Sequence, residues 1–240
     1  MAYYSFKEKY FKFEITMGTK KIGCVIAYRK GHTNYGTSLV GYALIKKIQK
    51  LGYDVEVINY VKRPTLIQKM AWVINAMRCG MGNVISDRLK GVKDLKNNAE
   101  YAANIKIRTD AVEAYKKRKL LPFFKDYVGF KALHDGSKKY DIIIVGSDQI
   151  WTPLSLPTKF FNLLFVDDKV RKVAYASSFG VSSIPEFQKK ATGAYLDRFH
   201  AIGVRELSGK KIVDALSRQT AQVVADPTLP LDSRRLRIQR

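Results

Sequence analysis

Short apolar segments alternate with amphipathic ones along most of the chain. Residues 21–28 are an apolar run rich in β-branched side chains, which is typical of a buried strand, and residues 54–60 are predicted to form a second strand. Between them, apolar residues recur at i, i+4, i+8 and i+11 from Val40, the spacing of one helix face, and Gly52 suits the left-handed residue that ends a helix. This order predicts a βαβ unit with two parallel strands.

The same alternation returns in the second half of the chain. From Pro64 to about Asp126 the pattern is helical and rich in lysine, so we expect helices inserted beside the sheet. Ser183 and Glu186 have the spacing of a capping box, with Pro185 in the first turn of a helix that runs to about Arg198. A further helix is predicted over 206–216. Further strands are predicted over 141–146, 172–176, 201–205 and 221–225. The sequence therefore predicts a doubly wound, mostly parallel, Rossmann-like α/β sheet with an inserted helical segment at about 64–126.

The net charge of the chain indicates that its partners are anionic. The net charge is +22, and residues 62–139 contain 18 Lys and Arg against 7 Asp and Glu. Such an excess attracts phosphorylated substrates, anionic membrane surfaces or nucleic acid, and does not choose among them. The basic residues are spread over many helices and no recognition motif occurs, so specific nucleic-acid binding is not expected. With no apolar run long enough to span a bilayer and no signal peptide, we expect a cytoplasmic protein, with the inner face of the membrane as a second location.

The loop after the first predicted strand is the first candidate site. Residues 31–36 contain His32, Asn34, Tyr35 and Gly36 and lead into a helix. Backbone amides at a helix start favour an anion or a sugar hydroxyl, although Asn34 can equally cap the helix and Gly36 permit the turn. The glycine spacing fits neither a dinucleotide fingerprint nor a phosphate-binding P-loop.

Two further strand ends carry polar groups. Ser147 and Asp148 end the strand at 141–146, where Asp148 can orient a hydroxyl, act as a general base, or form an Asx turn beneath Trp151. Arg205 ends the strand at 201–205, where it can hold a phosphate or carboxylate, or pair with the neighbouring helix or with Asp226. We expect these strand ends to share one edge of the sheet. No metal-ligand spacing is present, and Cys24 and Cys79 are expected to be buried free thiols.

Seven ordered motifs resemble the polysaccharide pyruvyl transferase family. They are Asn34-Tyr35-Gly36 with its helix, residues 51–60, residues 140–151, Phe165-Val166-Asp167-Asp168, residues 174–180, Val204-Arg205-Glu206 with Ser208-Gly209, and Asp226-Pro227-Thr228-Leu229. The resemblance covers about residues 20–231. It implies the first half of a two-domain architecture similar to GT-B glycosyltransferases.

The resemblance also implies a chemistry. Phosphoenolpyruvate is the co-substrate, a glycan or lipid-linked glycan precursor is the acceptor, and no further cofactor is needed. The product is a pyruvate ketal of the kind found in exopolysaccharides of the cell envelope. Arg205 matches an arginine that binds the donor, whereas Asn34, Tyr35, Gly36 and Ser147 line the substrate cleft. Asp148 and His32 are the catalytic candidates.

The chain departs from the family pattern at both ends. Residues 1–17 are interpreted as a non-family extension, 18–231 as the Rossmann-like domain, and 232–240 as a basic non-family tail. A second domain that completes the donor site is expected to be missing, so this chain alone is expected to be inactive. The alternative is a non-catalytic basic remnant that binds anionic glycan precursors at the membrane surface, or nucleic acid.

Overall fold

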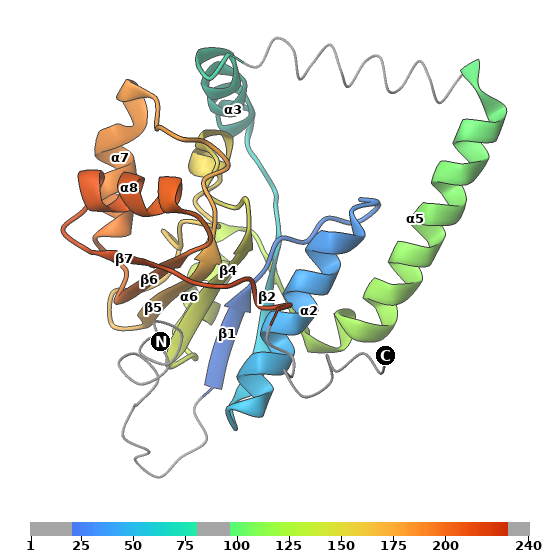
Figure 1. Cartoon of the computed structure of the whole chain (residues 1–240), viewed down its shortest axis with the longest axis horizontal. Coiled ribbons are helices and arrows are strands. Elements are labelled where there is room, and N and C mark those ends of the chain that lie inside the picture. The colour runs from blue at the N-terminus through green and yellow to red at the C-terminus, as the bar shows by residue number, and fades with distance from the viewer. Residues whose placement is uncertain (1–20, 81–96, 230–240) are drawn as a thin grey trace, which may run out of the picture.

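The computed structural model of the chain describes residues 21–80 and 97–229. A twisted sheet of seven parallel strands forms the centre of the molecule, in the order β3-β2-β1-β4-β5-β6-β7 (Figure 1). The strands are β1 (Lys21–Val25), β2 (Asp54–Val61), β3 (Phe124–Val128), β4 (Ile142–Asp148), β5 (Arg171–Ser177), β6 (Ala201–Val204) and β7 (Ala221–Val223). Successive strands add outward from β1 to β3, and the chain then returns to the other side of β1 as β4. The doubly wound α/β prediction is confirmed.

Helices cover both faces of this sheet. They are α2 (Tyr35–Lys50), α3 (Leu66–Arg78), α5 (Ala99–Lys119), α6 (Phe130–Ser137), α7 (Glu186–Leu196) and α8 (Leu207–Leu216), with 3₁₀ turns η1 (Leu121–Phe123) and η2 (Pro153–Thr158). One apolar cluster joins α2 to β1 and β2 through Leu44, Ile45 and Ile48. The larger cluster joins the opposite face to α6, α7 and α8. Because both faces are covered, the central strands β1 and β4 are buried and mostly apolar rather than alternating.

Trp151 is the centre of the larger apolar cluster. It is 3% exposed, and its ring lies 5.2 to 5.8 Å from the rings of Phe179, Tyr195 and Phe199. Its indole N–H donates to the carbonyl of Phe161 at 3.0 Å, so the polar atom is satisfied inside the core. Trp151 therefore fixes the segment that follows the tip of β4.

Several local predictions need correction. The helical segment expected up to Asp126 ends earlier, because Phe124–Val128 forms the edge strand β3 beside β2. Ser183 does not cap α7, which begins at Glu186 after Pro185 without a side-chain cap. His134 lies in α6, and its Nδ1 forms a hydrogen bond with the Phe165 carbonyl at 2.8 Å. Cys24 is buried as expected, whereas Cys79 is only partly buried.

The predicted segments 1–17 and 232–240 lie outside the described residues. Across the described part of the chain, no helix is both long enough and apolar enough to cross a membrane.

At the amino-terminal edge of the sheet, Glu56 is held by three donors. Lys21 and Lys139 approach its carboxylate at 2.8 and 2.6 Å, and the Tyr140 hydroxyl donates at 2.8 Å. Burial opposes ionisation, but these hydrogen bonds outweigh it and lower the pKa of Glu56 to about 2. The ionised carboxylate thus ties β1, β2 and the start of β4 together.

The lowered pKa of Glu56 predicts that part of the free energy of unfolding is lost in acid. Because the folded pKa lies below the ordinary value of 4.5, the contribution is present above pH 4.5 and is lost as the pH falls toward 2. We expect Glu56→Gln to lower the free energy of unfolding at neutral pH by about 1 kcal/mol, since water screens this partly exposed group. Urea unfolding of both proteins between neutral pH and about pH 3 measures this difference. A difference that does not shrink in acid would contradict the assignment.

Candidate functional site

A cavity of about 500 Å³ opens at the carboxyl end of the sheet, where the strand order reverses between β1 and β4. Open α/β sheets bind their ligands at this position. Residues from the segment after β1, from the start of α2, from the tips of β2 and β4, from α5 and from the segment after η2 line the cavity. They include Arg29, His32, Asn34, Thr37, Asn59, Tyr60, Lys62, Lys116, Asp148 and Phe160.

A buried lysine from α5 holds the loop between β1 and α2. Lys116 is 3% exposed, and its ammonium group donates to the carbonyls of Arg29 and His32 at 2.9 Å each and to Glu113 at 2.8 Å. Glu113 also accepts a hydrogen bond from the Gly31 amide at 2.9 Å, and Gly31 has the left-handed φ of 72° that this turn requires. The loop is thus shaped by a helix more than 80 residues away in sequence.

The start of α2 is joined directly to the tip of β4. Asn34 caps α2, its side-chain oxygen accepting from the Thr37 amide at 3.4 Å. The Thr37 hydroxyl donates to one oxygen of Asp148 at 2.8 Å, and the amide of Gln149 donates to the other at 2.8 Å. Asn34 therefore caps α2, as one of its two sequence interpretations expected, and both Asn34 and Asp148 line the cavity, where their roles toward a ligand stay predictions.

His32 lies between these two features. Its Nδ1 accepts a hydrogen bond from the Asn34 amide at 3.3 Å, so the proton of the neutral ring is on Nε2. The side chain is exposed and borders the cavity. His32 therefore offers a donor at the rim of the cavity.

Three other predicted residues lie near the cavity but are not among its lining residues. Tyr35 is 43% exposed and its ring meets that of Tyr115 at 5.0 Å. Gly36 belongs to α2, where an added Cβ would lie 3.2 Å from the capping oxygen of Asn34. Ser147 is buried with a left-handed φ of 56°, and its hydroxyl oxygen has no hydrogen-bond partner within the described part of the chain.

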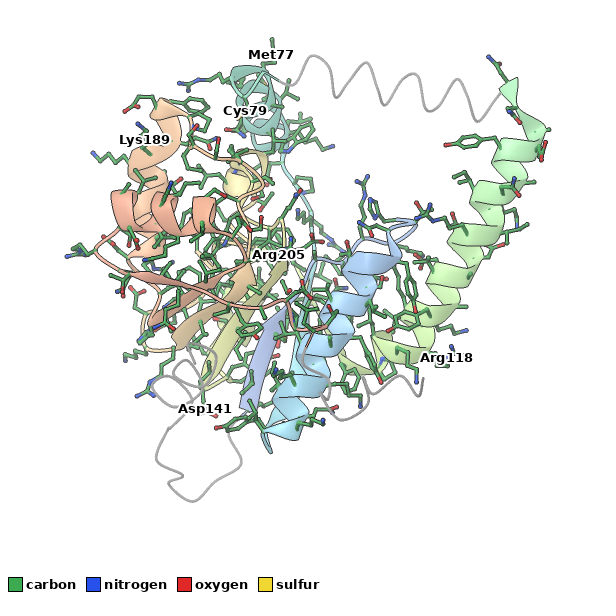
Figure 2. All side chains as sticks on the ribbon, viewed as in Figure 1. Met77, Cys79, Arg118, Asp141, Lys189 and Arg205 are labelled. Atoms are coloured by element: carbon green, nitrogen blue, oxygen red, sulfur yellow. The ribbon has the colours of Figure 1, made fainter. Side chains whose placement is uncertain are left out.

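Arg205 is on the same edge of the sheet but outside the cavity. Asp148 is in register with Ser177 of β5, and Ser177 is in register with Val204 of β6, so Arg205 is two strands away from Asp148. Figure 2 shows Arg205 near the upper edge of the sheet and Asp141 at the opposite edge. Its guanidinium pairs with Asp226 at 3.2 Å, as one of the two sequence interpretations expected. The expected shared edge exists, but one closed pocket does not contain all the predicted residues.

Several lining residues were not chosen from the sequence. Asn59 and Tyr60 stand at the end of β2, and the rule that strand ends bind ligands would have found them. Burial raises the pKa of Tyr60, and partial desolvation beside the cavity lowers the pKa of Lys62, although the Lys62 side chain stays largely accessible. The sequence carried no signal for Lys116.

Polar groups and aromatic rings line the cavity together. Amides, hydroxyls and one carboxylate stand beside the rings of Tyr60 and Phe160, whose centroids are 5.6 Å apart. Within residues 21–80 and 97–229, no group of three His, Cys, Asp or Glu side chains is placed to hold a metal ion. The fold and the cavity together define a Rossmann-like protein with a ligand site at the switch point of its sheet.

The comparison with family models identifies the family. The polysaccharide pyruvyl transferase model matches residues 34–239, most of the chain, and the chain belongs to this family. Searches of curated proteins and of solved structures each returned no match.

Removing the Lys116 ammonium should loosen the loop that carries His32. We expect Lys116→Met to speed hydrogen exchange of the amides at 29–34 on the order of tenfold or more, and to cost about 2 kcal/mol of stability. Exchange followed by mass spectrometry measures the first effect and urea unfolding the second. Lys117→Met removes an exposed lysine from the same helix and is the matched control. Equal rates of amide hydrogen exchange at residues 29–34 in both variants would show that the hydrogen bonds of Lys116 do not shape the loop.

Proposed function

We propose that this protein is a transferase that moves the pyruvyl group of phosphoenolpyruvate onto a glycan or glycan precursor as a ketal. The family match over residues 34–239 is the observation that carries the proposal. Positive charge along this edge of the sheet supports it, because Arg29 and Lys62 border the cavity, Arg205 lies on the same edge and the donor is strongly anionic. No separate cofactor enters the proposed reaction.

The proposed reaction conserves atoms through two additions. A sugar hydroxyl adds to the enol carbon that carries the phosphate while a proton is delivered to the methylene carbon, which becomes a methyl group. Phosphate then leaves with its bonding electron pair, and a second hydroxyl of the same acceptor closes the ketal and loses its proton. The enzyme must therefore hold the phosphate, orient two hydroxyls and move protons.

We assign the acceptor to the cavity. Asn34, Asn59 and Asp148 offer amide and carboxylate groups that match vicinal hydroxyls, and Tyr60 offers a ring face for a sugar. Asp148 is the base candidate, because Thr37 and Gln149 fix both of its oxygens at the border of the cavity. His32 is the candidate for proton delivery: as an imidazolium, with a proton on Nδ1 in place of the hydrogen bond from the Asn34 amide, it would give its Nε2 proton and return to the neutral ring.

We assign the charged end of the donor to Arg205, on the same sheet edge. The ion pair with Asp226 uses one terminal nitrogen, and a guanidinium group has five N–H donors. Asp226 is itself fixed by Thr228, whose amide and hydroxyl donate to it at 3.0 and 2.7 Å. Asp226 can therefore orient Arg205 toward a phosphate rather than only neutralise it.

The reaction itself is tested by incubating the full-length gene product with phosphoenolpyruvate radiolabelled in its carbon atoms and a panel of glycan acceptors. We expect label to enter the glycan with release of one phosphate per ketal. Transfer of a sugar from a nucleotide donor, with no label taken from phosphoenolpyruvate, would place the activity in another class of transferase.

Replacing the carboxylate of Asp148 should affect the chemical step. We expect Asp148→Asn, which keeps an oxygen acceptor for Thr37, to lower kcat on the order of 10² to 10³ while the fold is unchanged. Asp135→Asn removes a surface carboxylate from α6 and should leave kcat intact. Steady-state transfer rates, with circular dichroism as the folding check, make the measurement. A normal kcat in Asp148→Asn would remove this residue from the proposed chemistry.

Replacing Arg205 should weaken the binding of the donor without weakening the binding of the acceptor. We expect Arg205→Met to raise KM for phosphoenolpyruvate about tenfold or more and to leave the acceptor KM nearly unchanged. Arg218→Met is the matched control, because Arg218 makes a similar ion pair with Asp197 at 3.1 Å, in the connection that leads into the opposite edge of the sheet. A rise in the acceptor KM alone would place Arg205 with the acceptor instead.

A further inference from the structure

Helix α3 exposes an apolar face to solvent. Its outward side chains recur at i, i+1, i+4, i+7, i+8 and i+11, an arc of about 120° at 3.6 residues per turn. They are Leu66, Ile67, Met70, Val73, Ile74 and Met77, each between 48% and 79% exposed. We call these six residues the α3 stripe. In a helix that packs on its own protein, such a stripe would face the core.

The opposite side of α3 is anchored to the protein by polar contacts. Asn75 donates to the carbonyl of Pro153 in η2 at 3.2 Å and accepts from the Gln188 amide of α7 at 2.6 Å. Gln188 is buried and also donates to Pro153 at 3.0 Å, while Ala76 is the buried apolar residue of the helix. Because these bonds orient the helix, the α3 stripe is held outward.

Basic residues flank the α3 stripe on both sides. Lys69 precedes one edge of the arc and Arg78 follows the other, and residues 61–80 contain four basic and no acidic side chains. Arg78 also lies over the ring of Phe187 in α7, with its guanidinium carbon 3.8 Å from the ring centroid. Apolar residues between basic flanks are the arrangement of helices that lie in the surface of an anionic bilayer.

The place of α3 in the fold connects this face with the cavity. The helix begins four residues after Lys62, which lines the cavity. Figure 1 shows α3 standing beyond the strand tips, beside α7, and Figure 2 shows Met77 at its outer end, farther from the sheet than Cys79. A bilayer bound to α3 would therefore lie beside the edge of the sheet where the cavity opens.

We propose that α3 is a membrane-docking helix, whose stripe inserts into the surface of an anionic lipid bilayer while Lys69 and Arg78 contact the lipid phosphates. The proposal is independent of the pyruvyl transfer, because it rests on the exposure, anchoring and flanking charge of α3. If the acceptor is a lipid-linked glycan, docking brings the cavity to the surface where that acceptor is held.

Vesicle flotation of the full chain tests the proposal. The probes are vesicles of phosphatidylcholine alone and vesicles in which about a third of the lipid is phosphatidylglycerol. We expect binding to the anionic vesicles at least tenfold tighter than to the neutral ones, weakened by salt. Ile67→Gln combined with Ile74→Gln should weaken the anionic binding tenfold or more. Both positions are exposed, so the variant should keep its thermal midpoint.

A matched double variant tests whether vesicle binding depends on α3 or on exposed apolar side chains anywhere on the surface. Ile107→Gln combined with Leu207→Gln removes two side chains, 68% and 69% exposed, from α5 and α8, and should bind vesicles like the wild type. Equal loss in both double variants, or none in either, would overturn the proposal. Sedimentation in the absence of lipid tests whether the protein self-associates through the α3 stripe. If the wild type self-associates and only the α3 double variant does not, the stripe is a contact between copies and the docking proposal is overturned. If the protein does not bind vesicles but still transfers the pyruvyl group to a water-soluble acceptor, the docking proposal is wrong and the proposed transferase activity stands.

Discussion

The parallel pairing of β1 with β4 is the constraint on which the site depends. Ile22 to Val25 are in register with Ile142 to Val145, so the ends of two strands 120 residues apart in sequence stand side by side. Sequential strands diverge from this pair in opposite directions, which leaves space above it that no crossover fills. The hydrogen bond from Thr37 to Asp148 spans this junction, joining the helix after β1 to the tip of β4. The same bond is thus part of the fold and part of the site.

The large positive charge has more than one role in this fold. Lys116 and Lys172 are almost fully buried, and each donates to backbone carbonyls of a loop as well as to a carboxylate. Burial lowers the pKa of Lys172, with Arg198 adding to the effect and Asp168 opposing it. A bulk count of charge therefore overstates the charge available to a ligand. The positive charge that stays accessible includes Arg29 and Lys62 beside the cavity and Lys69 and Arg78 on α3.

The segments that could be predicted are those with a local cause. The strands β1 and β4 contain continuous apolar runs, β2 is rich in valine and isoleucine, and the parallel order of β1 and β2 follows from the intervening helix. Edge strand β3 was missed because Lys125 and Asp126 interrupt its apolar pattern and only contact with β2 makes it a strand. Asp148 and Asn34 could be chosen from their position at strand ends. Lys116 could not, because its role depends on a contact across 84 to 87 residues.

Helix α3 departs from the rule that α2 and α8 follow. In α2 and α8 the buried residues are largely apolar and face the sheet, so burial of that face orients each helix. In α3 only Ala76 is buried, and hydrogen bonds through Asn75 and Gln188 orient the helix instead. A hydrogen bond of this kind contributes only about 1 kcal/mol, far less than burying six large apolar side chains would. Anchoring by hydrogen bonds therefore leaves most of the apolar surface of α3 exposed near the carboxyl end of the sheet. The lipid bilayer that we propose as the partner of α3 would bury this surface.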